Sequence, residues 1–139
     1  MKEKVLIDSS FLFALYDRDD KYHDDAVYFA RDDSRTRIVP DVVLTEVAYM
    51  IKRAVGQHIV PVFLNDVTRS PIQLQPVLAE DVKRAREVML KYPSAKLDFV
   101  DCCIMALAER LEITQICTFD RRDFSIYRAQ DGDALELLP

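Results

Sequence analysis

The chain has 139 residues, half of them hydrophobic and only two of them glycine, which predicts one compact, helix-rich domain with a sizeable core and excludes a disordered chain. Its net charge of −5 gives no electrostatic footprint of a non-specific nucleic-acid binder. An acidic chain can still act on nucleic acid if metal ions neutralise its acidic site.

The first residues, the apolar runs and the cysteines indicate where in the cell the protein is expected. The first residues, MKEKVLIDSS, are too few and too charged for a signal peptide, and no apolar run approaches the ~18–20 residues of a membrane span. The three cysteines lack metal-ligand spacing, and we interpret them as reduced core residues. No linker, repeat or low-complexity segment divides the chain. We therefore expect a single domain over residues 1–139 that is soluble and cytoplasmic and has no membrane partner.

A buried strand opens the chain. The run KVLI, residues 4–7, is apolar, and Asp8 ends it. Ser9 or Ser10 is a candidate N-cap of the helix that follows, which would make a capping role for Asp8 redundant. The segment 17–25 is dense in acids but lacks the alternating ligands and turn glycine of a calcium loop, so we interpret it as a solvated loop.

A second strand, residues 36–40, leads into a helix over 42–55 with Asp41 as its expected N-cap. The apolar side chains of this helix recur at helical spacing, at Val43, Val47, Met50 and Ala54. Glu46 falls among them. Such a glutamate either lies at the edge of the buried face or is held inward for chemistry, and the sequence leaves both readings open.

The middle of the chain continues this alternation. Residues 59–67 suit a short helix, 71–76 a third strand, 79–90 a further helix and 134–138 a last strand. In the helix over 79–90 we expect a buried face and a solvated one. The inward positions are Val82, Ala85, Val88 and Met89, and the solvated ones are Lys83, Arg84 and Arg86.

The segment 96–124 combines a helix, a strand and several acids. The helix, about 98–110, has one face expected to be buried, formed by Val100, Ile104, Leu107, Ala108 and Leu111. Asp98 is a candidate N-cap for it. Asp101, one turn later, lies close to the apolar stripe, where an ionised carboxylate needs a partner, a cation or water. The strand ITQICTF follows, and Asp120 comes just after it.

Strands that alternate with helices predict a three-layer α/β/α sandwich with a mainly parallel sheet. The carboxyl ends of parallel strands meet at one edge, which brings Asp8 and Asp120 together with Glu46 and the Asp98/Asp101 pair. Carboxylates collected in this way repel one another unless a cation lies between them, and a hard divalent ion, Mg²⁺ or Mn²⁺, suits oxygen ligands. One or two such ions can activate water to attack a phosphodiester.

These segments together resemble the PIN-domain nucleases, in particular the VapC-like toxins of bacterial and archaeal toxin–antitoxin pairs. Four segments in this order carry the resemblance over essentially the whole chain: VLIDSSFLFALYDRDDKYHDDA, VPDVVLTEVAYMI, LDFVDCCIMALAERL and ICTFDRRDF. The resemblance implies a five-stranded parallel sheet, a homodimer, Mg²⁺- or Mn²⁺-dependent cleavage of RNA, and a partner antitoxin that blocks the acidic pocket, commonly with an arginine.

The resemblance also assigns residues. The acidic metal site would consist of Asp8, Glu46, Asp101 and Asp120, with Asp98 as an additional acid that replaces or supports Asp101. Ser10 and Thr118 match positions that carry a hydroxyl near the site. Asp123 either helps or, as the better reading, is exposed or caps a helix. Arg121 and Arg122 either contact substrate phosphates or are merely solvated.

Two alternative functions belong to other classes. A catalytically inactive PIN-like binding module would use the acids only for folding or partner recognition. A phosphoryl-transfer domain with an aspartate at a strand end is disfavoured, because DSSFL lacks a second aspartate two residues after Asp8.

Overall fold

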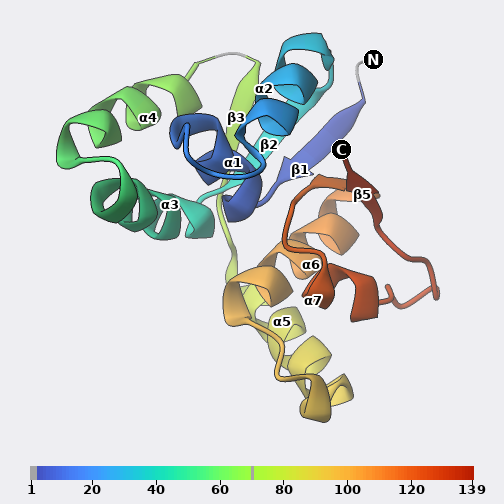
Figure 1. The fold of residues 1–139 in the computed structure, drawn as a ribbon. Helices are drawn as coiled ribbons and strands as arrows, with labels where there is room; N and C mark the ends of the chain where they lie inside the picture. The colour runs from blue at the N-terminus through green and yellow to red at the C-terminus, as the bar shows by residue number, and fades with distance from the viewer. Residues whose placement is uncertain (1–2, 70) are drawn as a thin grey trace.

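The fold is a five-stranded sheet between two layers of helices, and every strand pairing in it is parallel (Figure 1). The computed structural model describes residues 3–69 and 71–139. The predicted domain over 1–139 thus includes three residues, 1, 2 and 70, that lie outside the described part. The strands are β1 (Lys4–Ile7), β2 (Thr36–Pro40), β3 (Ile72–Gln75), β4 (Gln115–Cys117) and β5 (Glu136–Leu138).

The helices divide between the two faces of the sheet. On one face lie α1 (Ser9–Tyr16), α2 (His23–Asp32), α3 (Val42–Ala54) and α4 (Val60–Val67), and the short turn η1 (Gln57–Ile59) joins the last two. On the other lie α5 (Ala79–Lys91), the turn η2 (Pro93–Ala95), α6 (Phe99–Leu111) and α7 (Arg122–Ile126). The α/β sandwich with a parallel sheet that the sequence predicted is therefore confirmed. None of the helices in the described ranges is long and apolar enough to cross a membrane.

The strand order, β3-β2-β1-β4-β5, places a topological switch point between β1 and β4. The connections after β1 and β2 lead toward one edge of the sheet, whereas those after β3 and β4 lead to and beyond the other side of β1. Ligands of open α/β sheets bind at such a point, outside the carboxyl ends of the strands. Here the two strand ends are followed by Asp8 and by the segment 118–120.

Helix α6 is buried more completely than its periodicity predicted. We expected one buried face, but every residue from Asp101 to Ala108 is buried. The helix packs beneath the sheet and is also covered by α5 and α7, so that side chains on all sides of it meet protein. A helix that is apolar all round belongs in such a position.

In two other helices the buried positions differ slightly from the predicted ones. In α5, Val82 and Met89 are exposed, and the buried positions are Ala85, Val88 and the acid Asp81. In α3, Val43 and Val47 are buried as expected, but Ile51 completes the face because Ala54 is exposed and Met50 only half-buried. Arg84 is not simply solvated, since it forms an ion pair with Glu109 across the α5–α6 interface.

Two of the predicted N-cap positions are confirmed, and the third is wrong. Asp98 is the N-cap of α6, where its carboxylate accepts the backbone N–H of Asp101 at 3.3 Å. Asp41 occupies the predicted N-cap position of α3, but its carboxylate forms no cap bond there and accepts the N–H of Val77 instead. Ser9 and Ser10 lie inside α1, whose N-cap position is Asp8.

Candidate active site

Asp8 is held at the end of β1 by two hydroxyl groups. Its Oδ2 accepts hydrogen bonds from Ser10 Oγ at 2.9 Å and from Thr118 Oγ1 at 2.8 Å. The side chain is 3% exposed, and this burial, strengthened by the nearby charge of Asp120, raises the pKa of Asp8 even though both hydroxyls stabilise the ionised form. Asp8 is therefore an oriented carboxylate in a place where a lone negative charge is unfavourable.

The same two hydroxyls also fix the segment after β4. Ser10 Oγ accepts the backbone N–H of Phe119 at 3.0 Å, and Thr118 Oγ1 accepts the N–H of Asp120 at 3.0 Å. These bonds join the ends of β1 and β4, which are neighbours in the sheet. Ser10 and Thr118 therefore lie beside the acidic residues, as expected, and they position Asp120 next to Asp8.

Asp101 is a second buried carboxyl group of this region whose pKa is strongly raised. It is 6% exposed, and burial together with the charges of Asp8, Asp98 and Asp123 raises its pKa from 3.8 to about 9. Its carboxyl group is thus protonated at neutral pH while no cation is near. A divalent cation would reverse this, because it favours the ionised carboxylate.

Asp123 was expected to be exposed or to cap a helix, and the expectation of exposure is wrong. Asp123 is 5% exposed, and its Oδ2 accepts the backbone N–H of Asp98 at 2.9 Å. Its other oxygen pairs with Arg122, which also donates to the carbonyl of Ala95. The contact ties the beginning of α7 to the beginning of α6, and no local pattern in the sequence reports it.

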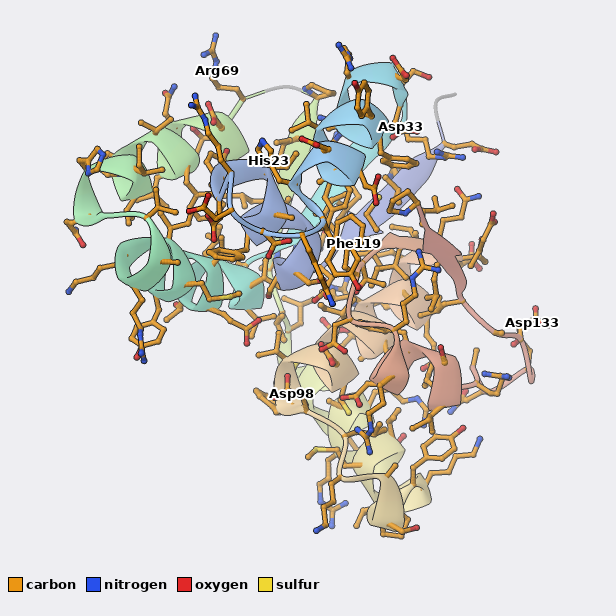
Figure 2. The ribbon with its side chains drawn as sticks, viewed as in Figure 1. His23, Asp33, Arg69, Asp98, Phe119 and Asp133 are labelled. Atoms are coloured by element: carbon orange, nitrogen blue, oxygen red, sulfur yellow. The ribbon has the colours of Figure 1, made fainter. Side chains whose placement is uncertain are left out.

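The acids line one pocket of about 510 Å³, called the acidic pocket below. Asp98 is among them and lies at the start of α6 (Figure 2). The structure brings together all the acids assigned to the site from the sequence, and it adds Lys96 and Met50, which the sequence analysis did not assign to the site. The lining residues are Asp8, Ser9, Ser10, Glu46, Met50, Lys96, Asp98, Asp101, Asp120, Arg122 and Asp123. Arg121 lies outside this pocket and donates to the carbonyl oxygen of Pro139.

The donor set of the acidic pocket fits a hard divalent cation. Six carboxylates face two cationic side chains, Lys96 and Arg122, and no histidine or cysteine lines the pocket. Within residues 3–69 and 71–139, however, no three acidic, histidine or cysteine side chains are close enough to hold an ion as they stand. Binding would therefore require carboxylates to rotate inward, as expected of groups that repel one another while no cation lies between them.

The chain belongs to the PIN-domain family, because the model of the PIN domain matches residues 5–130. The sequence is 24% identical to Ribonuclease VapC26 of Mycobacterium tuberculosis over 135 residues, which are 97% of this chain and the whole of that protein.

Solved structures show the same fold. The crystal structure of M. tuberculosis VapC20, described as a Sarcin-Ricin loop cleaving toxin, is similar with a TM-score of 0.81 at 21% identity, over 88% of this chain and 93% of that one. VapBC2 from Rickettsia felis, bound to a DNA fragment from its promoter, matches with a TM-score of 0.69 at 14% identity, over 98% of this chain and 99% of that one. A toxin–antitoxin complex from Klebsiella pneumoniae matches with a TM-score of 0.66 at 16% identity, over 97% and 96%.

Proposed function

We propose that this protein is a metal-dependent endoribonuclease and the toxin of a toxin–antitoxin pair. One observation carries the proposal: Asp101 is buried among other carboxylates at the switch point of the sheet, and its pKa is raised to about 9. Burial of one carboxyl group among other carboxylates lowers the stability of the fold, but the same groups can bind a cation. The similarity to a ribonuclease over nearly the whole chain supports RNA as the substrate.

In this proposal Asp8, Glu46, Asp101 and Asp120 hold Mg²⁺ or Mn²⁺. The ion would supply an activated water and stabilise charge on the phosphodiester, and one or two ions would serve. Ser10 and Thr118 orient Asp8 through the hydrogen bonds given above.

Asp98 and Asp123 support the four proposed metal ligands. Asp98 caps α6 and is available as a further ligand, and Asp123 anchors the start of α6 through the N–H of Asp98. Arg122 and Lys96, on the wall of the acidic pocket, are placed to attract substrate phosphates. We assign Arg121 no contact with the reacting group.

The proposed partners are RNA, an antitoxin and a second copy of the chain. Two of the similar structures, VapBC2 and the complex from Klebsiella pneumoniae, support an antitoxin as a partner of this chain. In the proposal this antitoxin covers the acidic pocket. Leu74, Leu78 and Val82, at the edge strand β3 and the start of α5, are exposed apolar side chains that a homodimer would cover. A cytoplasmic location agrees with the three cysteines, which are buried and unbridged.

A second candidate function is a PIN-like binding module without catalysis. It is favoured by the finding that no three acids of the described residues are arranged to hold an ion. In that case the protonated Asp101 and its neighbours would serve folding or recognition of a partner.

Cleavage of a mixed pool of structured RNAs by the purified chain tests the proposal. We expect cleavage with Mg²⁺ or Mn²⁺, none with EDTA, and a loss of about 10³-fold or more in Asp8→Asn, because a lost ligand removes several kcal/mol of transition-state stabilisation. If Asp8→Asn cleaves as fast as the parent, the proposed metal site is wrong. A parent that neither cleaves RNA nor binds Mn²⁺ would establish the binding module instead.

A further inference from the structure

Lys96 has an unusual backbone conformation for its residue type. In the described part of the chain it is one of two residues other than glycine with a positive φ, and the second is Glu112 at the end of α6. The φ and ψ of Lys96 are both 52°, the left-handed region in which most side chains crowd the backbone and lower stability. Glycine or asparagine would fit this position better, so a lysine there points to a use for its side chain.

The turn that carries Lys96 is held from both sides by the beginning of α7. Arg122 donates to the carbonyl oxygen of Ala95, and Asp123 Oδ2 accepts the N–H of Asp98 at 2.9 Å. These contacts come from a distant part of the sequence and fix the backbone immediately before and after the turn. The exposed side chain of Lys96 is thereby kept at one place on the wall of the acidic pocket.

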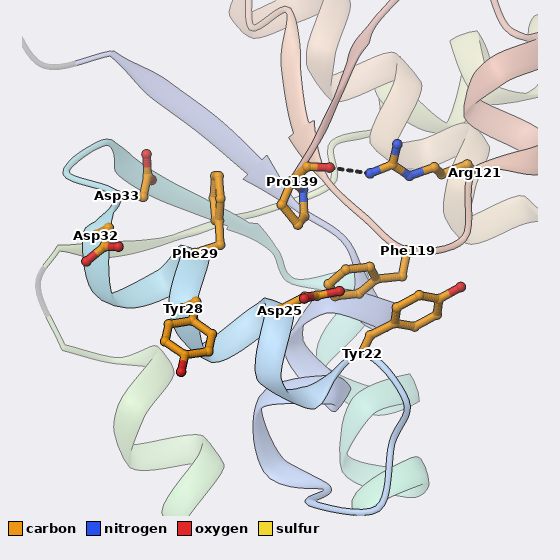
Figure 3. Close-up of a pocket in the computed structure, with 9 residues that line it drawn as sticks. All are labelled: Tyr22, Asp25, Tyr28, Phe29, Asp32, Asp33, Phe119, Arg121 and Pro139. Carbon is orange, nitrogen blue, oxygen red and sulfur yellow. Dashed lines mark hydrogen bonds between the residues drawn. The ribbon is translucent and has the colours of Figure 1, made fainter.

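Lys96 is also the cation of this pocket that is left without a partner. Its ammonium group forms no ion pair with any residue in the ranges 3–69 and 71–139. Arg122, the second cation of the lining, pairs with Asp123. Arg121 lies outside the pocket, and its guanidinium donates to the carbonyl oxygen of Pro139 (Figure 3). Among these three cations, Lys96 is the one that is free to meet a ligand.

The charge of the acidic pocket gives such a cation a role. Six carboxylates line it, and a phosphodiester, which is itself an anion, is repelled by each of them that has no counter-ion. A lysine at a fixed position on the wall offsets part of this repulsion where the phosphate lies. The guanidinium of Arg122 offers less, because its donors are partly used by Asp123 and by the carbonyl of Ala95.

We propose that Lys96 is a catalytic residue of the nuclease and that its ammonium group contacts a non-bridging oxygen of the scissile phosphodiester. The inference rests on the proposed function and deepens it, because long-range attraction of RNA needs no fixed turn, whereas contact with one reacting group does.

The reaction itself is hydrolysis. A water oxygen bonds to phosphorus, and the bond from phosphorus to the leaving ribose oxygen breaks. The water gives one proton to solvent, and the leaving oxygen takes one up from solvent. Lys96 stabilises the negative charge that develops on the phosphoryl oxygens and keeps its own proton throughout.

Substitutions at position 96 separate catalysis from folding. Lys96→Gly removes both the cation and the backbone strain, so the midpoint of thermal unfolding should rise by about 2–4 °C while kcat for RNA falls about 100-fold and KM changes less than about threefold. Lys96→Asn also tolerates the left-handed backbone and should lose the same activity, which excludes the added freedom of glycine as the cause. Lys96→Arg keeps the charge and should cleave within about tenfold of the parent rate.

Glu112→Gly is the matched control. Glu112 has a φ of 55° and does not line the acidic pocket, so this variant should gain similar stability and cleave RNA as fast as the parent. Added methylammonium supplies a second readout that folding alone does not move. It should restore part of the cleavage in Lys96→Gly and none in Asp8→Asn, which lacks a proposed metal ligand.

Three results would overturn the inference. If Lys96→Gly and Lys96→Asn cleave as fast as an active parent chain, Lys96 has no catalytic role, and the nuclease proposal stands without it. A rise in KM with kcat unchanged would mean that Lys96 only attracts RNA. A parent chain that cleaves no RNA with Mg²⁺ or Mn²⁺ would remove the nuclease proposal and the inference with it.

Discussion

Two buried aspartates on neighbouring helices have opposite surroundings. Asp81 in α5 is 1% exposed, and Arg110 of α6 donates to both of its oxygens, at 2.8 and 2.9 Å. Asp101 in α6 is 6% exposed, and the charges that shift its pKa are those of other carboxylates. The chain thus supplies a cationic partner to the buried carboxylate of Asp81 at the α5–α6 interface but none to that of Asp101.

The comparison distinguishes carboxylates that stabilise the fold through an ion pair from carboxylates that lack a cationic partner and are available to a ligand. The α5–α6 interface has a second compensated pair, in which Arg84 donates to both oxygens of Glu109 at 2.6 and 3.0 Å. A buried carboxylate that already forms an ion pair with a guanidinium is a poor ligand for a metal ion. Asp101 has no such partner, so a cation that compensates its charge has to come from outside the protein.

The largest expected effect on stability is that of removing the charge of Asp101. Its folded-state pKa, about 9, is above its ordinary 3.8, so the folded protein binds more protons than the unfolded chain between about pH 4 and pH 9. The free energy of unfolding therefore falls as pH rises through this window, by up to ~1.4 kcal/mol per pH unit. Asp101→Asn should raise the free energy of unfolding at pH 7 by on the order of 2–4 kcal/mol and change it little at pH 4.

Urea denaturation of metal-free protein at several pH values measures this effect. Asp81→Asn is the matched comparison and should destabilise the protein, because it weakens the contact with Arg110. Mg²⁺ should stabilise the parent chain and not Asp101→Asn, which should also lose RNA cleavage. Equal destabilisation by the two variants at pH 7 would mean that Asp101 is an ordinary structural acid.

A smaller effect on the free energy of unfolding is expected from breaking the ion pair between Asp81 and Arg110. Arg110→Met keeps most of the apolar stem but leaves the carboxylate of Asp81 buried without its partner. Loss of one partner of a buried pair costs about 3–5 kcal/mol, and we expect about 2–3 kcal/mol because the Arg110 side chain is 24% exposed. Arg86→Met is the control: Arg86 is exposed on α5, forms no ion pair within the described ranges, and should change stability by less than about 0.5 kcal/mol. Thermal unfolding with similar losses in both variants would contradict the role of the pair.

Local patterns predicted the parallel sheet of this molecule and most of the acids in its acidic pocket. Apolar runs ended by an acid, as at Ile7–Asp8, indicated parallel strands whose ends meet, and helical spacing placed Glu46 and Asp101 near them. The run CCIMALA also carried a signal that one-face periodicity missed, since a helix without a polar side is buried all round.

Contacts between distant segments could not be predicted in this way. The burial of Asp123 depends on the backbone N–H of Asp98, and the pairing of Asp81 depends on how α5 lies against α6. The same rotation of α5 exposes Val82 and Met89, which an averaged helical pattern had placed inside. These features are set by tertiary packing, which a single sequence does not encode at any one position.

The smallest expected effect compares two adjacent serines at the start of α1. Ser10 Oγ donates to Asp8 and accepts the N–H groups of Phe119 and Asp120, whereas the buried Ser9 Oγ has no partner in the part of the chain that is described. Ser10→Ala should cost about 1–2 kcal/mol in the free energy of unfolding and lower RNA cleavage about 10- to 100-fold, because Asp8 loses one of its orienting bonds. Ser9→Ala removes an unsatisfied hydroxyl and should be neutral or slightly stabilising, with activity unchanged. If denaturation and cleavage assays rank the two variants the other way, the hydroxyl of Ser10 does not organise the acidic pocket.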